Sequence, residues 1–162
     1  MTLAPRRATW VIAASFAAAL ALAIVPLPQW AALFRPDWAA LVLVYWALAL
    51  PHRVAVGTGW LVGLLLDVLR GAILGQHALA LAVVAYLAVR LHQRLRVFPL
   101  WQQALAVLLL LALDQLIVAW IDGIAGLPGG DWRQFGAALT GMLLWPWVFA
   151  SLRGLRRRYR VS

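Results

Sequence analysis

The chain has 162 residues, of which 65% are hydrophobic and only 12% are charged, and its formal net charge is +9. This charged fraction is about half that of an average soluble domain, which excludes a soluble globular protein and a disordered one. The absence of cysteine excludes disulfide frameworks, thiolate metal sites and thiol nucleophiles. The composition therefore predicts an all-α polytopic membrane protein.

Six apolar segments are candidates for membrane-spanning helices, which need roughly 20 mostly apolar residues each. In chain order they cover residues 10–27, 37–50, 54–69, 73–89, 100–121 and 135–152, within a single integral membrane domain over residues 1–162. Only Pro51, His52 and Arg53 separate the second segment from the third. Because proline disfavours continuation of the preceding helix, we expect a tight hairpin that presents these three residues to cytoplasmic partners. The alternative is one long hydrophobic region with a re-entrant bend.

The distribution of arginine predicts the orientation of these spans. If the N-terminus is cytoplasmic, eleven of the fourteen arginines fall in cytoplasmic segments. This asymmetry follows the positive-inside rule, so we expect both termini in the cytoplasm and no nucleic-acid partner for the basic charge. Five cations follow the last span and are expected to anchor the topology and attract anionic lipids. They are Arg153, Arg156, Arg157, Arg158 and Arg160.

Two aspartates lie inside predicted spans, where an ionisable group is costly and marks a candidate functional site. Asp67 and Asp114 both lie about 20 Å along their helices at 1.5 Å per residue, which places them at a similar depth in the outer half of the bilayer. We predict a polar core or pocket formed by these carboxylates with Arg70 and His77, able to share a proton or bind a cation. The alternative is that Asp67 reaches the surface and pairs with Arg70 at the helix end.

Small residues and one proline predict how the helices pack. Gly59 and Gly63 share a helix face at a spacing of four, and glycine there allows another backbone to approach closely. Trp145 and Pro146 lie within the last span, and Pro146 predicts a kink because it removes a helical hydrogen bond.

The two intramembrane aspartates raise one enzyme hypothesis, an aspartyl membrane protease. Signal peptidase II is similar in size and uses such a pair, but its motifs place Asn near each Asp, and this chain contains no Asn. The sequence also lacks the pattern of a rhomboid-type serine protease and of a metal cluster. We therefore expect no enzymatic activity, no metal and no cofactor. A small-molecule or lipid-binding subunit of a transporter is the alternative function, because buried carboxylates can couple to protons or cations.

Ordered motifs run through most of the chain. They include Phe34-Arg35-Pro36-Asp37-Trp38, Leu48-Ala49-Leu50-Pro51-His52-Arg53-Val54, Leu100-Trp101-Gln102-Gln103-Ala104-Leu105 and Leu144-Trp145-Pro146-Trp147. In this order and spacing, the sequence resembles the MreD family of rod shape-determining proteins over about residues 8–158.

The resemblance implies a non-enzymatic scaffold in the bacterial inner membrane, within the elongation machinery that builds the lateral cell wall. It implies MreC, a bitopic periplasmic protein, as the closest partner. The wider complex would include the actin-like MreB, the glycosyltransferase RodA and a penicillin-binding transpeptidase. The fold would be similar to the six-helix substrate-binding components of vitamin transporters. The loop over residues 122–134 carries none of the motifs, so the resemblance assigns it no role.

Overall fold

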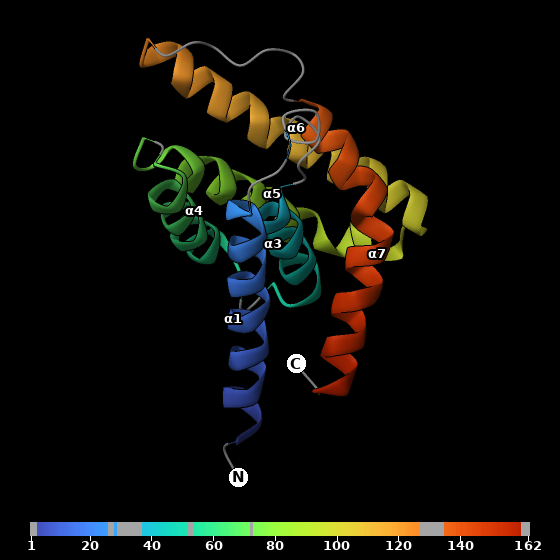
Figure 1. The fold of residues 1–162 in the computed structure, drawn as a ribbon. Coiled ribbons are helices and arrows are strands. Elements are labelled where there is room, and N and C mark those ends of the chain that lie inside the picture. The colour runs from blue at the N-terminus through green and yellow to red at the C-terminus, as the bar shows by residue number, and fades with distance from the viewer. Residues whose placement is uncertain are drawn as a thin grey trace.

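The computed structural model describes residues 3–25, 28, 37–51, 54–71, 73–126 and 135–159. Within these ranges the regular structure is helical (Figure 1). The helices are α1 (Leu3–Ile24), α3 (Trp38–Ala49), α4 (Val56–Arg70), α5 (Gln76–Val97), α6 (Leu100–Ile124) and α7 (Gly136–Arg158). Each helix corresponds to one of the six predicted segments, and the all-α class is confirmed.

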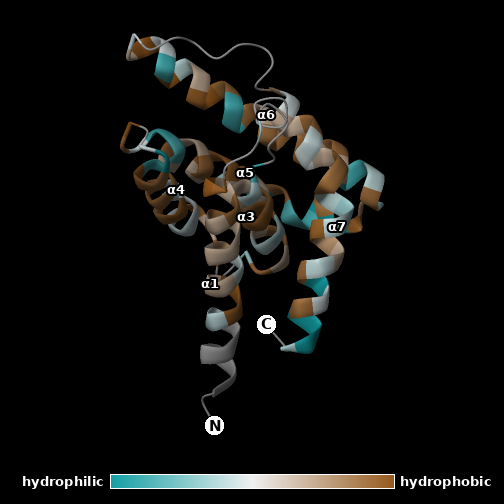
Figure 2. Cartoon of the chain, in the orientation of Figure 1, coloured by the Kyte–Doolittle hydropathy of each residue, from teal (hydrophilic) through white to brown (hydrophobic). Residues whose placement is uncertain are grey.

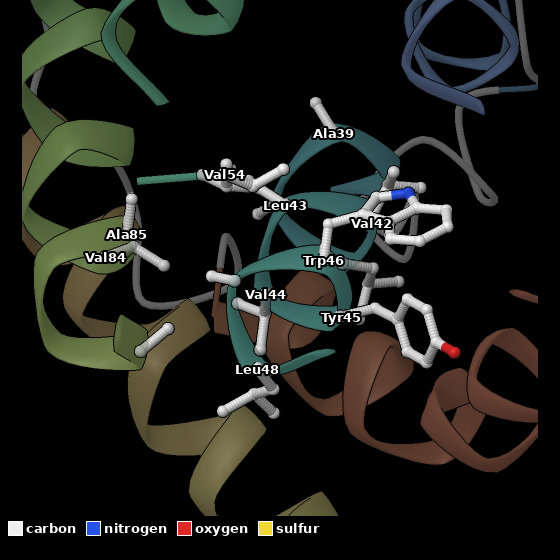
Figure 3. Close-up of a cluster of buried hydrophobic side chains, with 14 of the residues drawn as sticks. Ala39, Val42, Leu43, Val44, Tyr45, Trp46, Leu48, Val54, Val84 and Ala85 are labelled. Atoms are coloured by element: carbon white, nitrogen blue, oxygen red, sulfur yellow. The ribbon is translucent and has the colours of Figure 1, made fainter. Parts of the chain in front are cut away.

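Helix α3 is the centre of the fold. Every residue of this helix after Trp38 is buried, and the helix contacts α1, α5, α6 and α7. Figure 3 shows the side chains of α3 pointing in several directions. Val84 and Ala85 of α5, and Val54 just before α4, lie beside them in the core. Its 12 residues extend about 18 Å, less than the roughly 30 Å of a bilayer core. Since other helices enclose α3, this short length suits a helix that packs inside protein rather than against lipid.

Helices α4 and α5 form a closely packed hairpin. A Cβ atom on Gly63 would lie 2.3 Å from Cα of Ala78, and one on Gly59 would lie 2.7 Å from the carbonyl oxygen of Leu81. The backbones of α4 and α5 therefore approach each other closely at Gly59 and Gly63, as the four-residue spacing of these glycines predicts.

Several helices begin or end away from the limits of the apolar segments. Helix α5 continues to Val97 instead of residue 89, and α7 continues to Arg158 instead of residue 152. Both extensions are rich in arginine, a strong helix former, and α5 stops only just before Pro99. Helix α1 begins at Leu3, ahead of residue 10, and ends at Ile24. The described part of the basic tail is therefore helical, which gives its arginines a fixed register.

The outer surface of the molecule is strongly apolar. Many large hydrophobic side chains are exposed, among them Leu61, Val68, Leu109 and Leu143. In Figure 2, hydrophobic residues continue along the outer helices, while hydrophilic residues gather at the last turns of α7. Helices α5 and α6 are long and apolar enough to cross a membrane, whereas the apolar stretch Thr9–Ile24 and helix α3 are shorter. This surface suits a lipid environment.

Candidate functional site

Asp67, in the last turn of α4, is buried against the start of α5. Its Oδ1 accepts the backbone N–H of His77 at 2.9 Å and lies 2.7 Å from His77 Nδ1. Its Oδ2 accepts the backbone N–H groups of Gly75 at 2.9 Å and Ala78 at 3.4 Å. N–H groups at the start of a helix have no acceptor inside that helix, and a negative charge there is favourable. Asp67 therefore caps α5 from the neighbouring helix.

The local backbone explains why a remote residue takes this role. The residue at the N-cap position of α5 is Gly75, which has a φ of 99° and no side chain to cap the helix. A carboxylate offers about four acceptor positions, and the four contacts to α5 occupy them. Within the described residues the side chain of Asp67 contacts that of His77, so the alternative pairing with Arg70 is not formed. Asp67 holds the hairpin together and has no vacant acceptor for a ligand.

Asp114, on α6, is fully buried and meets a third carboxyl group, that of Asp37. The two carboxyl groups and the Arg70 guanidinium are near enough to interact electrostatically. Asp37 also accepts the backbone N–H of Ala40 at 3.2 Å and so caps α3. Two buried carboxyl groups that lie close together can share one proton. The pair is therefore a place where the fold can hold a proton.

One atom of this pair is unsatisfied. Asp114 Oδ1 is buried and has no hydrogen-bond partner in the part of the chain that the structure describes. Such a group is costly in a protein interior, and each instance calls for a physical explanation.

The structure thus divides the polar site that the sequence predicts. Asp67 is joined to His77, whereas Asp114 is joined to Asp37 with Arg70 nearby. The sequence predicts that Asp37 begins a span, but it does not indicate that Asp37 belongs to the polar site. A signal was available, because an aspartate immediately before a helical segment is a typical N-cap.

A further polar contact connects α5 to α6. Gln76 Nε2 donates to Asp122 Oδ1 at 2.6 Å and to the carbonyl oxygen of Val118 at 3.0 Å. Asp122 lies in the last turn of α6, although the sequence predicts a loop over residues 122–134, of which residues 127–134 lie outside the described residues. We call this side of the molecule the acidic end, defined by Asp37, Asp67, Asp114 and Asp122. Within the described ranges, no group of three or more His, Asp or Glu side chains could hold a metal ion.

The remaining predicted site residues lie elsewhere. Pro51 follows the end of α3, while the expectations for His52, Arg53 and Arg160 fall outside the described residues. Trp145 is fully buried and its Nε1 donates to Gln103 Oε1 at 3.4 Å. Pro146 is exposed within α7, and the helix continues on both sides of it. The tail arginines that the structure describes, Arg153, Arg156, Arg157 and Arg158, lie on the last turns of α7.

Comparison with known proteins connects this architecture to a function. A family model described as rod shape-determining protein MreD matches residues 5–155. The rod shape-determining protein MreD of Haemophilus influenzae is 34% identical over 152 residues, which cover 94% of this chain and 94% of that protein. No solved structure matches the chain. The matched region includes all four carboxylates of the acidic end.

Proposed function

Since the chain belongs to the MreD family of rod shape-determining proteins, we propose that it is a non-enzymatic scaffold in the machinery that elongates rod-shaped bacteria. Family membership gives the role in determining rod shape, and the match over residues 5–155 is the observation that carries the proposal. The scaffold role adds that the protein organises lateral peptidoglycan synthesis by binding other membrane proteins.

The proposed setting is the bacterial inner membrane, with six spans and both termini in the cytoplasm. The charge distribution supports this orientation, because the carboxylates of Asp37, at the N-cap of α3, and of α6 lie toward one end, and α5 and α7 carry arginines at the other. The first turn of α1 and the last turn of α7 lie toward the same end of the molecule in Figure 1. An even number of spans likewise requires both termini on the same side of the membrane.

The proposed direct partner is MreC, in a wider complex with MreB, RodA and a penicillin-binding transpeptidase. Most described residues lie in helices, so partners within the membrane must meet helix faces. A groove of about 490 Å³ between α1 and α4 offers such a face, and Phe16, Leu61 and Leu65 contribute to its lining. A second, of about 360 Å³, lies between α1, α3 and α7 and includes Leu22, Val42 and Trp147.

Crosslinking in cells tests the partner assignment. A photoreactive residue placed at Leu61 or Leu65 probes the first groove, and one at Leu22 or Trp147 probes the second. Leu109 on α6 is 71% exposed and serves as a control outside both grooves. Adducts with MreC from one groove and none from Leu109 would support a specific contact. Equal yields at all positions would contradict it.

Depletion tests the scaffold role as a whole. We expect loss of the protein to displace MreC from its normal sites and to widen the cells. Normal MreC localisation and normal cell width after depletion would contradict the proposal, as would turnover of a substrate by the purified protein.

A ligand-binding subunit is the second candidate, and the unpartnered Asp114 Oδ1 is the observation that favours it. The fold similarity to the substrate-binding components of vitamin transporters, which the family resemblance implies, stays a prediction under either function. A small molecule that co-purifies with the protein and raises its melting temperature would support it, provided that Asp114→Asn reduces the shift.

A further inference from the structure

A cavity of about 380 Å³ opens among the ends of α3, α5 and α7 and the start of α6. Its polar lining includes the guanidinium groups of Arg96, Arg153 and Arg156 together with Tyr45 and Gln103. We call it the arginine cavity. It lies away from the acidic end, because Asp37 and Asp67 cap the starts of α3 and α5, whereas these helices contribute to the cavity near their last turns.

The three arginines are positioned by the fold. Arg96 donates from Nε to the carbonyl oxygen of Leu48 at 2.7 Å and from Nη2 to that of Ala49 at 2.5 Å, so it satisfies the C-terminus of α3. An arginine has five N–H donors, and these two bonds use two of those on Arg96. Arg153 lies over the ring of Phe149, 5.9 Å from its centroid.

Neutral donors complete the lining. Tyr45 is buried, and it lines the cavity together with Arg156. In Figure 3 this hydroxyl points away from α3 toward α7. Gln103 is buried as well, and one of its amide donors reaches the carbonyl oxygen of Leu95 at 2.8 Å. The second N–H of that amide group is a further donor at the cavity wall.

The cavity gathers positive charge without an acidic side chain to balance it. The described carboxylates are those of the acidic end, and none of them lines the cavity. Three guanidinium groups around one space repel each other, and their N–H donors suit an anion. A phosphate group matches them best, because the planar fork of arginine binds two phosphate oxygens at once.

We propose that the arginine cavity binds the phosphate group of an anionic membrane lipid. Under the proposed orientation the cavity lies at the cytoplasmic surface, where basic pockets between spanning helices bind lipid headgroups. Leu48, Ala49 and Phe149 supply an apolar wall for the part of the lipid next to the phosphate. Binding here requires a fixed cavity with several helices around it, which distinguishes it from a general attraction of the basic tail to the membrane. The proposal does not depend on the scaffold role.

Lipid binding to the delipidated, full-length protein in neutral detergent tests the proposal. Native mass spectrometry measures the affinity for phosphatidylglycerol at moderate ionic strength, where a Debye length of about 8 Å weakens diffuse attraction. The test variant is Arg153→Gln with Arg156→Gln. The matched control is Arg157→Gln with Arg158→Gln, which removes the same charge from the same helix but does not touch the cavity. Melting temperatures verify that both variants fold.

We expect the test variant to bind phosphatidylglycerol about 30-fold more weakly, since each arginine contributes about 1 kcal/mol and tenfold corresponds to about 1.4 kcal/mol. The control is expected to lose less than about threefold, and phosphatidylcholine is expected to bind the native protein weakly. The single variant Tyr45→Phe removes a neutral donor and is expected to weaken binding severalfold without a change of charge.

Three results would overturn the proposal. Equal losses in the test variant and the control would show attraction to the tail instead of the cavity. Equal binding of phosphatidylcholine would show that the negative charge is not recognised. Inorganic phosphate that displaces the lipid at equal concentration would identify a soluble anion as the ligand.

Discussion

Asp67 shows how one side chain determines the geometry of two helices. Its carboxylate receives three backbone N–H groups at the start of α5 and faces the His77 ring. An isolated helix would leave these donors to water, which a membrane interior does not supply. The connection between α4 and α5 depends on this residue.

We predict that Asp67→Ala lowers the free energy of unfolding by about 2–4 kcal/mol, because several charge-assisted hydrogen bonds and a helix cap are lost together. Asp67→Asn should fall between this variant and the native protein, since it retains one acceptor oxygen. Unfolding in detergent, followed by circular dichroism, measures the difference. Val68 is 67% exposed on the same turn, so Val68→Ala is a control expected to change stability by less than about 0.5 kcal/mol. Equal effects of Asp67→Ala and Val68→Ala would contradict the capping role.

Asp114 leads to a different expectation because its partner is another carboxyl group. Asp114→Asn can hydrogen-bond to Asp37 and no longer needs a shared proton. We predict that this variant folds with a stability within about 1 kcal/mol of the native protein. A large loss of stability would instead show that an ionised Asp114 interacts with Arg70. If the variant folds and binds MreC but fails to support rod shape, the proton of the pair takes part in function.

The sequence identified the buried carboxylates together with His77 and Arg70, but not which aspartate each of them meets, nor that Asp37 belongs to the site. Asp67 and Asp114 could be selected because lipid penalises an ionisable group anywhere in a span. Their partners depend on a left-handed residue at Gly75 and on the packing of α3 beside α6. Neither of these features produces a periodic pattern in the sequence. The equal depth of Asp67 and Asp114 along their helices therefore suggested one shared site, whereas the structure has two separate ones.

At the scale of helices, the contact between α4 and α5 rests on Gly63. We predict that Gly63→Ala destabilises the protein by about 3 kcal/mol or more, because the added Cβ would lie 2.3 Å from Cα and 2.5 Å from N of Ala78. Gly57 lies on the same helix with nothing within 4 Å of an added Cβ. Gly57→Ala is therefore a control expected to be neutral or slightly stabilising. The same unfolding measurement compares the two variants, and similar values would show that the close approach is not required.

Helix existence was predictable, whereas helix ends were not. Apolar segments reveal where lipid or protein must surround a helix, but a helix can continue beyond that region wherever the sequence still favours it. The extension of α5 through Arg90, Arg94 and Arg96 is an example. This extension matters for function, because it places Arg96 against the end of α3. A loop that began after residue 89 would not hold Arg96 in a fixed position.

At the scale of the whole molecule, a buried central helix separates two ends of opposite character. Helix α3 begins at Asp37, beside the Asp114 carboxyl, and ends where Arg96 satisfies its last carbonyl groups. The described carboxylates lie toward the first end and the arginine cavity lies at the second, while many large hydrophobic side chains are exposed on the outer faces between them. This division is what a protein needs if each end meets a different aqueous compartment.

The two ends give a direct test of orientation, which the absence of native cysteine makes simple. Val97 is 80% exposed at the end of α5, and Ala125 is exposed just after α6. We predict that in spheroplasts a membrane-impermeant maleimide labels Ala125→Cys, because the positive-inside rule places the acidic end outside. Val97→Cys should react only after the membrane is opened, and Leu111→Cys, which is buried on α6, is the control that should not react in either case. Labelling of Val97→Cys in sealed spheroplasts would reverse the orientation and would move the arginine cavity to the opposite face of the membrane.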